Sequence, residues 1–232
     1  MKSIPAILIL FALTGCKSEN QYIIKGTVKG DFDNHWVYLV KFMEPEPDID
    51  SCYIRNGKFS FMGSIEYPEL FVLHNNPDSL LGFFPFFLEP ARIKIELNIK
   101  DWTWGSSIDG GNLNEEYNRL FRIPETELVK LNIETEEKMT AADSTEKAEL
   151  ESVRKKVEEE HMKLERDYFT KHPDSPFSPY LLAKSFFMLP LDESEKILTT
   201  FSEENKQTSI CLSLQDRLDR MHKYEEGSLE AE

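Results

Sequence analysis

Residues 52–62 read CYIRNGKFSFM, two short alternating segments joined by Asn56-Gly57. Asn-Gly is the preferred pair for a two-residue type I′ hairpin turn, because both turn positions need positive φ. A turn of this type sets the cross-strand pairs, which are Arg55 with Lys58, Ile54 with Phe59, and Cys52 with Phe61. We expect the apolar face of this hairpin to lie in the core. Its residues are Cys52, Ile54, Phe59 and Phe61.

Alternation of apolar and polar residues continues on both sides of the hairpin, from Tyr22 to about Gly111. A period of two is that of β-strands, and clusters of turn residues separate the runs. Pro85 cannot donate to a sheet, so the strand around it is expected at an edge or with a bulge. Seven or eight strands at this spacing indicate an antiparallel β-sandwich or barrel. Besides the hairpin, strands are expected at 22–28, 36–42, 70–74, 83–88, 92–99 and 102–108.

The pattern becomes helical after this region, which makes the fold class α+β, with a β domain at 22–111 and a helical domain at 112–232. We expect Asn114 to cap the first helix. A long charged helix at about 144–171 carries a narrow apolar stripe, suited to packing on its own domain or to pairing with another chain. The stripe consists of Leu150, Val153, Val157, Leu164 and Tyr168. Three further helices are expected at 180–189, 192–201 and 208–224, the second of them capped by Asp192.

The first residues resemble a bacterial lipoprotein signal peptide. Lys2 gives a positive start, residues 4–13 are apolar, and Leu13-Thr14-Gly15-Cys16 matches the lipobox pattern. In that family the peptide is cleaved between Gly15 and Cys16, and the cysteine carries the lipid, palmitate included. The apolar run is too short to span a bilayer, which needs about 20 residues.

This resemblance divides the N-terminus into a signal peptide at 1–15 and a lipidated tether at 16–21. Lys17 follows the cysteine. In such lipoproteins an Asp at that place is the usual signal for retention in the inner membrane, so its absence favours the outer membrane. The periplasmic and the surface-facing side both stay open. An uncleaved membrane helix is the alternative interpretation of this segment.

The composition limits the partners and the redox chemistry. The 232 residues carry a formal net charge of −15, and an acidic surface repels nucleic acid and anionic lipid headgroups. Apart from Cys16, the cysteines are Cys52 and Cys211, which form no Cys-x-x-Cys pattern and are too few for a disulfide framework. In an exported protein these two could still pair.

No motif in the sequence indicates catalysis, a cofactor or a metal, so we expect a protein that is not an enzyme. Asp31, Asp33 and Asn34 lack the Gly and Glu of an EF-hand, and a turn is expected there. Glu89 has no partner carboxylate or nucleophile near it in sequence, which favours a turn residue over a lone catalytic acid. The histidines lack metal-ligand spacing within any one element; they are His35, His74, His161, His172 and His222.

A dense group of aromatic residues is the best candidate for a binding surface. Both faces of the strand at 83–88 are apolar, so one of them needs cover. We expect the helical domain to supply that cover. An uncovered aromatic face would instead suit a glycan or a peptide. The group consists of Phe83, Phe84, Phe86, Phe87, Trp102 and Trp104.

The β domain also resembles a known family. Its markers lie within residues 23–121 and are Asn56-Gly57-Lys58-Phe59, Gly63 and Phe87-Leu88-Glu89. They are similar to a domain of unknown function, DUF4369, found in lipoproteins of the Bacteroidota. In that family a thioredoxin-like thiol-disulfide oxidoreductase domain with a Cys-x-x-Cys site usually follows. Here that domain is expected to be missing, since the sequence reaches Glu232 without it.

Together these patterns predict a lipid-anchored protein of the cell envelope that acts as a non-catalytic binding or scaffolding module. The family resemblance implies an alternative function. The chain would then be an accessory or truncated form of a thiol-disulfide oxidoreductase that works with a thioredoxin-like protein partner. A thioredoxin-like reading frame directly downstream would favour this alternative.

Overall fold

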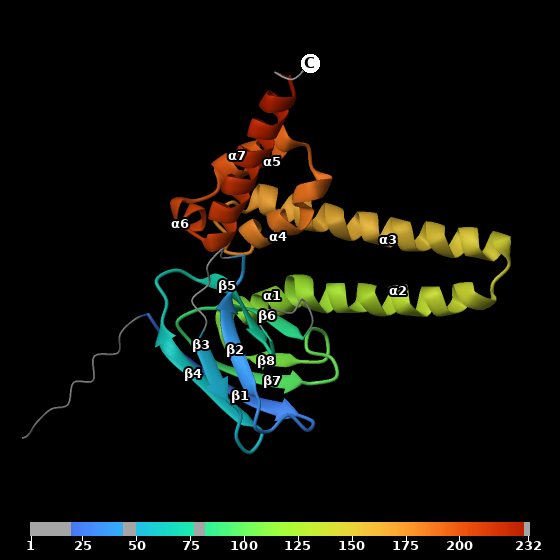
Figure 1. Ribbon diagram of the computed structural model, residues 1–232. Helices are drawn as coiled ribbons and strands as arrows, with labels where there is room; N and C mark the ends of the chain where they lie inside the picture. The colour runs from blue at the N-terminus through green and yellow to red at the C-terminus, as the bar shows by residue number, and fades with distance from the viewer. Residues whose placement is uncertain (1–19, 44–49, 77–81, 230–232) are drawn as a thin grey trace, which may run out of the picture.

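The computed structural model describes residues 20–43, 50–76 and 82–229, with side chains as far as residue 224 (Figure 1). The expected signal peptide, Cys16 and most of the tether lie outside the described residues. Within the described part strands come first and helices follow, which confirms the expected α+β fold.

The strands form two four-stranded sheets that pack face to face. The first sheet has the order β4-β1-β7-β8 and the second the order β3-β2-β5-β6. Their pairs are antiparallel except β1 with β7, which run parallel because a long connection through the second sheet separates them. The strands are β1 Gln21–Lys29, β2 Trp36–Lys41, β3 Asp50–Tyr53, β4 Lys58–Ser64, β5 Glu69–His74, β6 Phe83–Leu88, β7 Arg92–Asn98 and β8 Ser107–Asp109. The expected strand at 102–108 is therefore shorter and later than predicted.

The Asn56-Gly57 turn forms as expected, but its two strands separate at once. Asn56 has a φ of 52° and Gly57 a φ of 64°, and Arg55 and Lys58 exchange backbone hydrogen bonds of 3.0 and 3.1 Å. Beyond them β3 joins β2 in the second sheet, while β4 joins β1 in the first. The expected pairs of Ile54 with Phe59 and of Cys52 with Phe61 are therefore wrong. The observed pairs are Phe59 with Gly26, Phe61 with Ile24, and Cys52 with Val37.

The expected apolar face of the hairpin does lie in the core. Ile54, Phe59 and Phe61 are buried, and Cys52 is partly buried. The alternation of apolar and polar residues predicts the buried face of each strand correctly, because both sheets have one face toward the same core. The ring of Phe59 fills the space above its neighbour Gly26, where an added Cβ would lie 1.9 Å from the ring. The larger core residues around them include Ile24, Val37, Leu39, Leu73, Phe84, Phe86, Leu88, Ile93, Ile95, Leu97 and Trp102.

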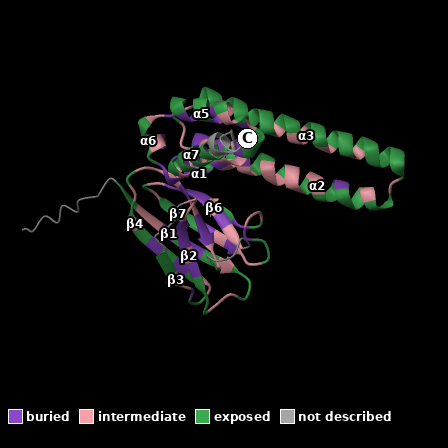
Figure 2. Cartoon of the chain, turned by 45° about the horizontal axis from the view of Figure 1, so that its top comes forward, coloured by how far each residue is buried: buried purple, intermediate pink, exposed green. Residues whose placement is uncertain are grey.

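The helices begin directly after β8 and include an arm that projects from the rest of the molecule (Figure 1). Helices α2 and α3 run antiparallel and form this arm, most of which is exposed (Figure 2). None of the described helices is both long and apolar enough to cross a membrane. The helices are α1 Asn112–Tyr117, η1 Asn118–Arg122, α2 Ile123–Ala141, α3 Ser144–Lys171, α4 Ser178–Ser185, η2 Phe186–Met188, α5 Leu191–Thr200, α6 Glu203–Lys206 and α7 Ser209–Leu229.

Both expected helix caps are wrong. Helix α1 begins at Asn112, so Asn114 lies inside the helix, where it is buried. Helix α5 begins at Leu191 after Pro190 and has no side-chain cap, so Asp192 lies in its first turn. A carboxylate there still interacts favourably with the positive end of the helix dipole.

The long helix α3 has the expected bounds but not the expected buried stripe. Val153 and Leu164 are 58% and 68% exposed, whereas Glu165 and Phe169 are buried. The helix packs on α2 along the arm and on α4 near its C-terminal end. Because the partner changes along its length, one straight apolar stripe cannot describe its contact face.

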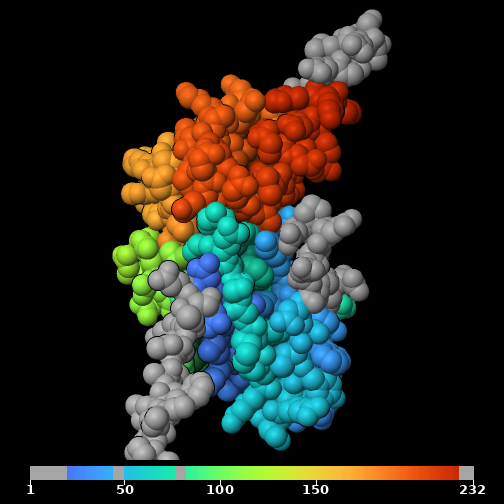
Figure 3. Space-filling model, turned by 90° about the vertical axis from the view of Figure 1, so that its left-hand side faces the viewer, coloured from blue at the N-terminus to red at the C-terminus, as the bar shows by residue number. Residues whose placement is uncertain are grey.

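The helical region covers one end of the second sheet, as Figure 3 shows with the orange and red helices above the blue and green strands. Phe87 on β6 and Leu70 on β5 leave the core between the sheets and join a second core formed with the helices. Phe87 contacts Tyr117 and Phe177, with ring centroids 5.2 and 4.9 Å apart. This confirms the expectation that the helical part covers the outer face of the strand at 83–88, which is an edge strand.

Two glutamates at strand ends cap helices that lie far from them in sequence. At the end of β6, Glu89 accepts a 2.8 Å hydrogen bond from the backbone N–H of Leu113 in α1. At the start of β5, Glu69 accepts a 3.3 Å hydrogen bond from the backbone N–H of Ser209, the first residue of α7. Helix N-termini have unpaired N–H groups and a positive dipole end, so carboxylates stabilise them. The two caps fix the helical region to the second sheet.

A candidate binding pocket where the second sheet meets the helices

A pocket of about 160 Å³ opens beside the edge strand β6. Its walls come from β6, from the turn before β8, and from the helices α1, α2 and α4 with η1 between them. Four of its side chains are aromatic and two are charged. The lining residues are Phe83, Pro85, Thr103, Trp104, Tyr117, Arg122, Glu125 and Tyr180.

Arg122 binds the strands to the start of α2. Its guanidinium donates hydrogen bonds to the backbone carbonyl oxygens of Thr103 at 2.6 Å, Ser106 at 3.2 Å and Pro85 at 3.4 Å. It also lies 4.2 Å from the centre of the Phe84 ring, which favours a cation over its face. Burial lowers the pKa of Arg122, but an arginine starts far above neutrality and stays charged.

The position of Arg122 depends on the π-helical turn η1, which ends at this residue. A π-turn adds one residue to a helical turn and so rotates the side chains that follow it. Tyr117, just before the turn, and Phe121, within it, are both buried in the second core. The turn therefore allows the same helical segment to pack its aromatic rings and to direct Arg122 toward the strands.

Two tyrosines line the pocket. The ring centroids of Tyr117 and Tyr180 are 6.0 Å apart, and the rings meet edge to face. Burial raises the pKa of both hydroxyls, that of Tyr117 strongly. Both tyrosines are therefore neutral at ordinary pH and can donate or accept hydrogen bonds.

A chain of charges extends from the pocket into the base of the arm. Lys184 on α4 contacts Glu125 on α2 at 3.0 Å and Glu165 on α3 at 2.6 Å. His161 Nε2 lies 3.3 Å from the same oxygen of Glu165. Burial opposes the charge of Glu165, but the close contact with His161 and the charge of Lys184 outweigh it and lower its pKa. The pKa of Lys184 is raised despite its burial, because a tyrosine and two carboxylates surround it.

The pKa shifts keep these groups in their usual protonation states over a wider pH range than in water. The tyrosines stay neutral, while Lys184 and Glu165 stay ionised. General acid–base catalysis requires a pKa near the working pH, and these shifts move away from it.

The structure divides the expected aromatic group into three parts. Phe83 and Trp104 line the pocket. Phe84, Phe86 and Trp102 lie in the core between the sheets, and Phe87 lies in the second core. Sequence reasoning missed the polar half of the pocket, because Tyr117, Arg122, Glu125 and Tyr180 come from helical segments up to 97 residues beyond Phe83. An arginine directly after the aromatic residues Tyr117 and Phe121 is the local signal that marks it.

The remaining expected site residues have structural roles. Asp33 Oδ1 accepts a 3.1 Å hydrogen bond from the Gly57 N–H, and the Asp33 carbonyl lies 2.9 Å from His35 Nδ1. The segment at 31–34 is thus a turn, as expected. Glu89 caps α1, and burial raises its pKa against the hydrogen bonds that it accepts from the helix. Within the described ranges, no group of three or more His, Cys, Asp or Glu is placed to hold a metal ion.

The two cysteines of the described part are not paired with each other. Cys211 is buried at the start of α7, and burial raises the pKa of its thiol to about 11. Cys52 is partly buried on β3, at the opposite edge of the second sheet from β6. A thiol with a raised pKa is a poor nucleophile, because the thiolate is the reactive form.

Comparison with known proteins identifies one part of the chain. No curated protein and no solved structure matched. Residues 22–117 match the model of a family described as a domain of unknown function, DUF4369. The matched segment includes the eight strands and α1, which supplies Tyr117 to the pocket. The similarity to DUF4369 therefore covers the strand region and the first helix, residues 22–117 of the 232.

Proposed function

We propose that this chain is a non-catalytic binding module of a Bacteroidota cell envelope, anchored to the outer membrane by lipid on Cys16. The binding site is the pocket between β6 and the helices. One observation carries this proposal: four aromatic side chains and two charged ones, Arg122 and Glu125, meet in one pocket.

The size of the pocket limits what it holds. Pockets for whole small-molecule ligands are typically about 300–1,000 Å³. A pocket of about 160 Å³ instead suits one side chain of a protein partner. The aromatic walls favour an aromatic or aliphatic side chain, and Arg122 and Glu125 provide polar groups beside it. We therefore propose a protein partner that inserts one apolar side chain here.

A pull-down from detergent-solubilised envelope tests this site. The bait is compared with its Trp104→Ala and Trp36→Ala variants. Trp104 lines the pocket, whereas Trp36 is 48% exposed on β2, outside it. A partner retained by the wild type and by Trp36→Ala but lost from Trp104→Ala supports the proposal. A partner retained equally by all three baits excludes the pocket as its binding site. Thermal unfolding of each variant checks that the fold is intact.

Lipid attachment is tested separately. Cys16→Ala removes the residue that the lipobox resemblance assigns to acylation. Labelled palmitate should enter the wild type and be absent from the variant, and the variant should keep its signal peptide. Equal labelling of the two proteins would contradict the lipoprotein proposal without affecting the binding site.

A further inference from the structure

One face of the β-sandwich stays open to solvent and carries a charge opposite to that of the chain. It is the outer face of the sheet β4-β1-β7-β8, opposite the face that packs on the second sheet. We call it the open face. Its cations are Lys25 and Lys29 on β1, Lys58 on β4, and Arg92 and Lys94 on β7; its carboxylates are Glu96 on β7 and Asp109 on β8.

Ion pairs within the open face leave three of its cations without a carboxylate partner. Lys29 binds Glu96 at 2.6 Å and Lys94 binds Asp109 at 3.2 Å. No described carboxylate lies within ion-pair distance of the others, which are Lys25, Lys58 and Arg92. The chain as a whole carries −15, so its acidic residues are concentrated elsewhere.

The strand register places like charges side by side. Lys25 on β1 is the direct neighbour of Lys94 on β7. Like charges in such positions destabilise a sheet, and an anion bound between them would remove the repulsion. A shallow hollow of about 840 Å³ lies over this part of the face, lined by Lys25, Lys58 and Lys94 and by the paired carboxylates Glu96 and Asp109. The arrangement therefore favours an anionic partner.

Apolar groups complete the face at one end. Met62 on β4 is 72% exposed and is the direct neighbour of Ile23 on β1, which in turn lies beside Arg92. A flat surface that combines cations with an exposed flexible apolar side chain fits the interface of a lipid bilayer, where headgroups are charged and acyl chains lie just below.

From these observations we propose that the open face lies against an anionic lipid bilayer. In one respect this rests on the proposed function: if Cys16 is lipidated, Gln21, where β1 begins, is only five residues further along the chain than the anchor. Five extended residues reach at most about 18 Å, so β1 must lie close to the bilayer. The charge pattern itself does not depend on the anchor.

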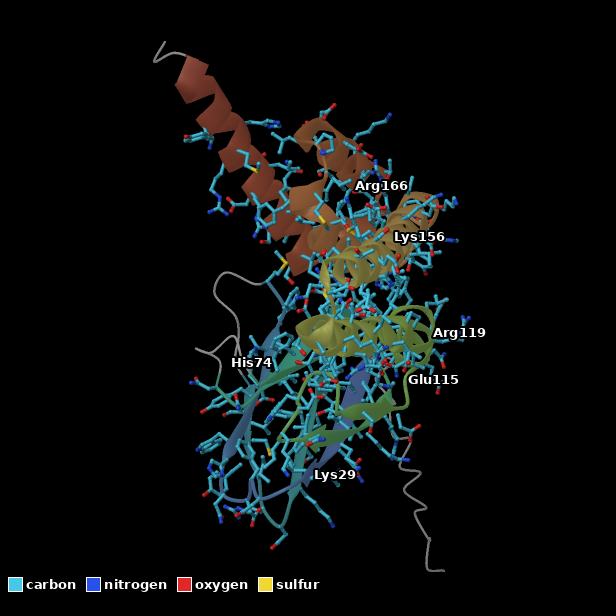
Figure 4. The ribbon with its side chains drawn as sticks, turned by 90° about the vertical axis from the view of Figure 1, so that its right-hand side faces the viewer. Lys29, His74, Glu115, Arg119, Lys156 and Arg166 are labelled. Carbon is cyan, nitrogen blue, oxygen red and sulfur yellow. The ribbon has the colours of Figure 1, made fainter. Side chains whose placement is uncertain are left out.

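The net charge does not prevent this contact. Screening at physiological ionic strength limits the reach of a charge to about 8 Å. Figure 4 shows Lys29 of the open face near the lower end of the strands and Lys156 of the arm up on α3, away from that face. A bilayer in contact with the open face is therefore influenced mainly by the charges of that face.

Vesicle co-sedimentation tests the proposal. The full chain carries Cys16→Ser, so that no lipid is attached, and is mixed with vesicles of phosphatidylcholine alone or with added phosphatidylglycerol. The double variant Lys25→Glu/Lys58→Glu reverses two exposed, unpaired cations of the open face. Its matched control, Lys147→Glu/Lys156→Glu, makes the same change of net charge at two exposed, unpaired lysines of α3.

Binding to the anionic vesicles should weaken at least about 25-fold in the first variant, because each cation at such a surface contributes about fivefold. The control should bind within about twofold of the parent, and high salt should release all three proteins. Lys25→Gln/Lys58→Gln, which only removes the charges, should give a smaller loss than the reversal.

Three results would overturn the proposal. They are equal binding by the open-face variant and its control, equal binding to both kinds of vesicle, and binding to the soluble polyanion heparin without binding to anionic vesicles. Because the vesicle assay uses unlipidated protein, its result can be interpreted even if the palmitate test fails. The pull-down result depends on neither the vesicle assay nor the palmitate test.

Discussion

Asn114→Ala should be among the most destabilising single substitutions at a polar residue of this protein. The side chain of Asn114 holds both backbone groups of Phe87 at the outer edge of β6. Its Oδ1 accepts from the Phe87 N–H at 2.9 Å, and its Nδ2 donates to the Phe87 carbonyl at 2.8 Å. Asn114 is 2% exposed, so water cannot replace these bonds in the folded protein. The side-chain amide therefore makes the backbone hydrogen bonds that a neighbouring strand would otherwise make with this edge of β6.

The expected loss follows from the two groups left unpaired. Each buried backbone group without a partner costs about 1–3 kcal/mol. Alanine favours the helix by about 0.5 kcal/mol over asparagine, which offsets part of this. The net loss should be about 2–5 kcal/mol, a large share of the roughly 5–15 kcal/mol that holds a typical domain folded.

Urea unfolding followed by circular dichroism and by tryptophan fluorescence measures this loss. Asn112→Ala is the matched control, because Asn112 is exposed at the start of the same helix; it should change stability by less than about 0.5 kcal/mol. Amide hydrogen exchange at Phe87 should also accelerate in Asn114→Ala. A loss below about 1 kcal/mol with unchanged exchange would refute the role assigned to this side chain.

Three further predictions concern the core, the charge network and the thiols. Phe61→Ala should cost about 3–5 kcal/mol in the same unfolding assay, since Phe61 is buried between the sheets; a loss below about 1 kcal/mol would contradict that location. Pairing lowers the pKa of Glu165 below 4.5 when folded, so its stabilisation is present above pH 4.5 and is lost as the pH falls through the lower folded pKa. Glu165→Gln should therefore flatten the plot of stability against pH in that acid range, and an unchanged slope would show that Glu165 is not the group responsible. Native protein should react slowly at Cys211, whose thiol pKa is about 11, and should not accelerate insulin reduction by dithiothreitol; rapid labelling at neutral pH would favour the oxidoreductase alternative.

Local patterns predicted the faces of the strands well because the period of two depends only on the chain itself. Phe59 and Phe61 point inward whichever sheet β4 joins. Which strand lies beside β4 is a different question, decided by contacts with residues 31 or more positions away, and the short turn at Asn56-Gly57 carries no information about them. The register prediction failed for that reason.

The helical region likewise has features that the sequence predicts and features that it does not. Helix α3 was predictable with its bounds because Asp143 and the proline after His172 mark its two ends. Helix α2 has no comparable start signal, since it continues directly from the π-turn at 118–122. Nor could the pocket be predicted from sequence, because Arg122 acquires its role only when three carbonyl oxygens of the strand region surround it.

The dependence of β6 on side chains from α1 has a consequence for biosynthesis. The ribosome releases the strands before the helices, so for some time β6 has an open edge and Phe87 an uncovered ring. An exposed edge strand with apolar side chains is a template for pairing with other chains. The nascent protein is therefore most prone to aggregate after β8 has emerged and before α1 has docked, a window that slow translation beyond residue 112 would lengthen.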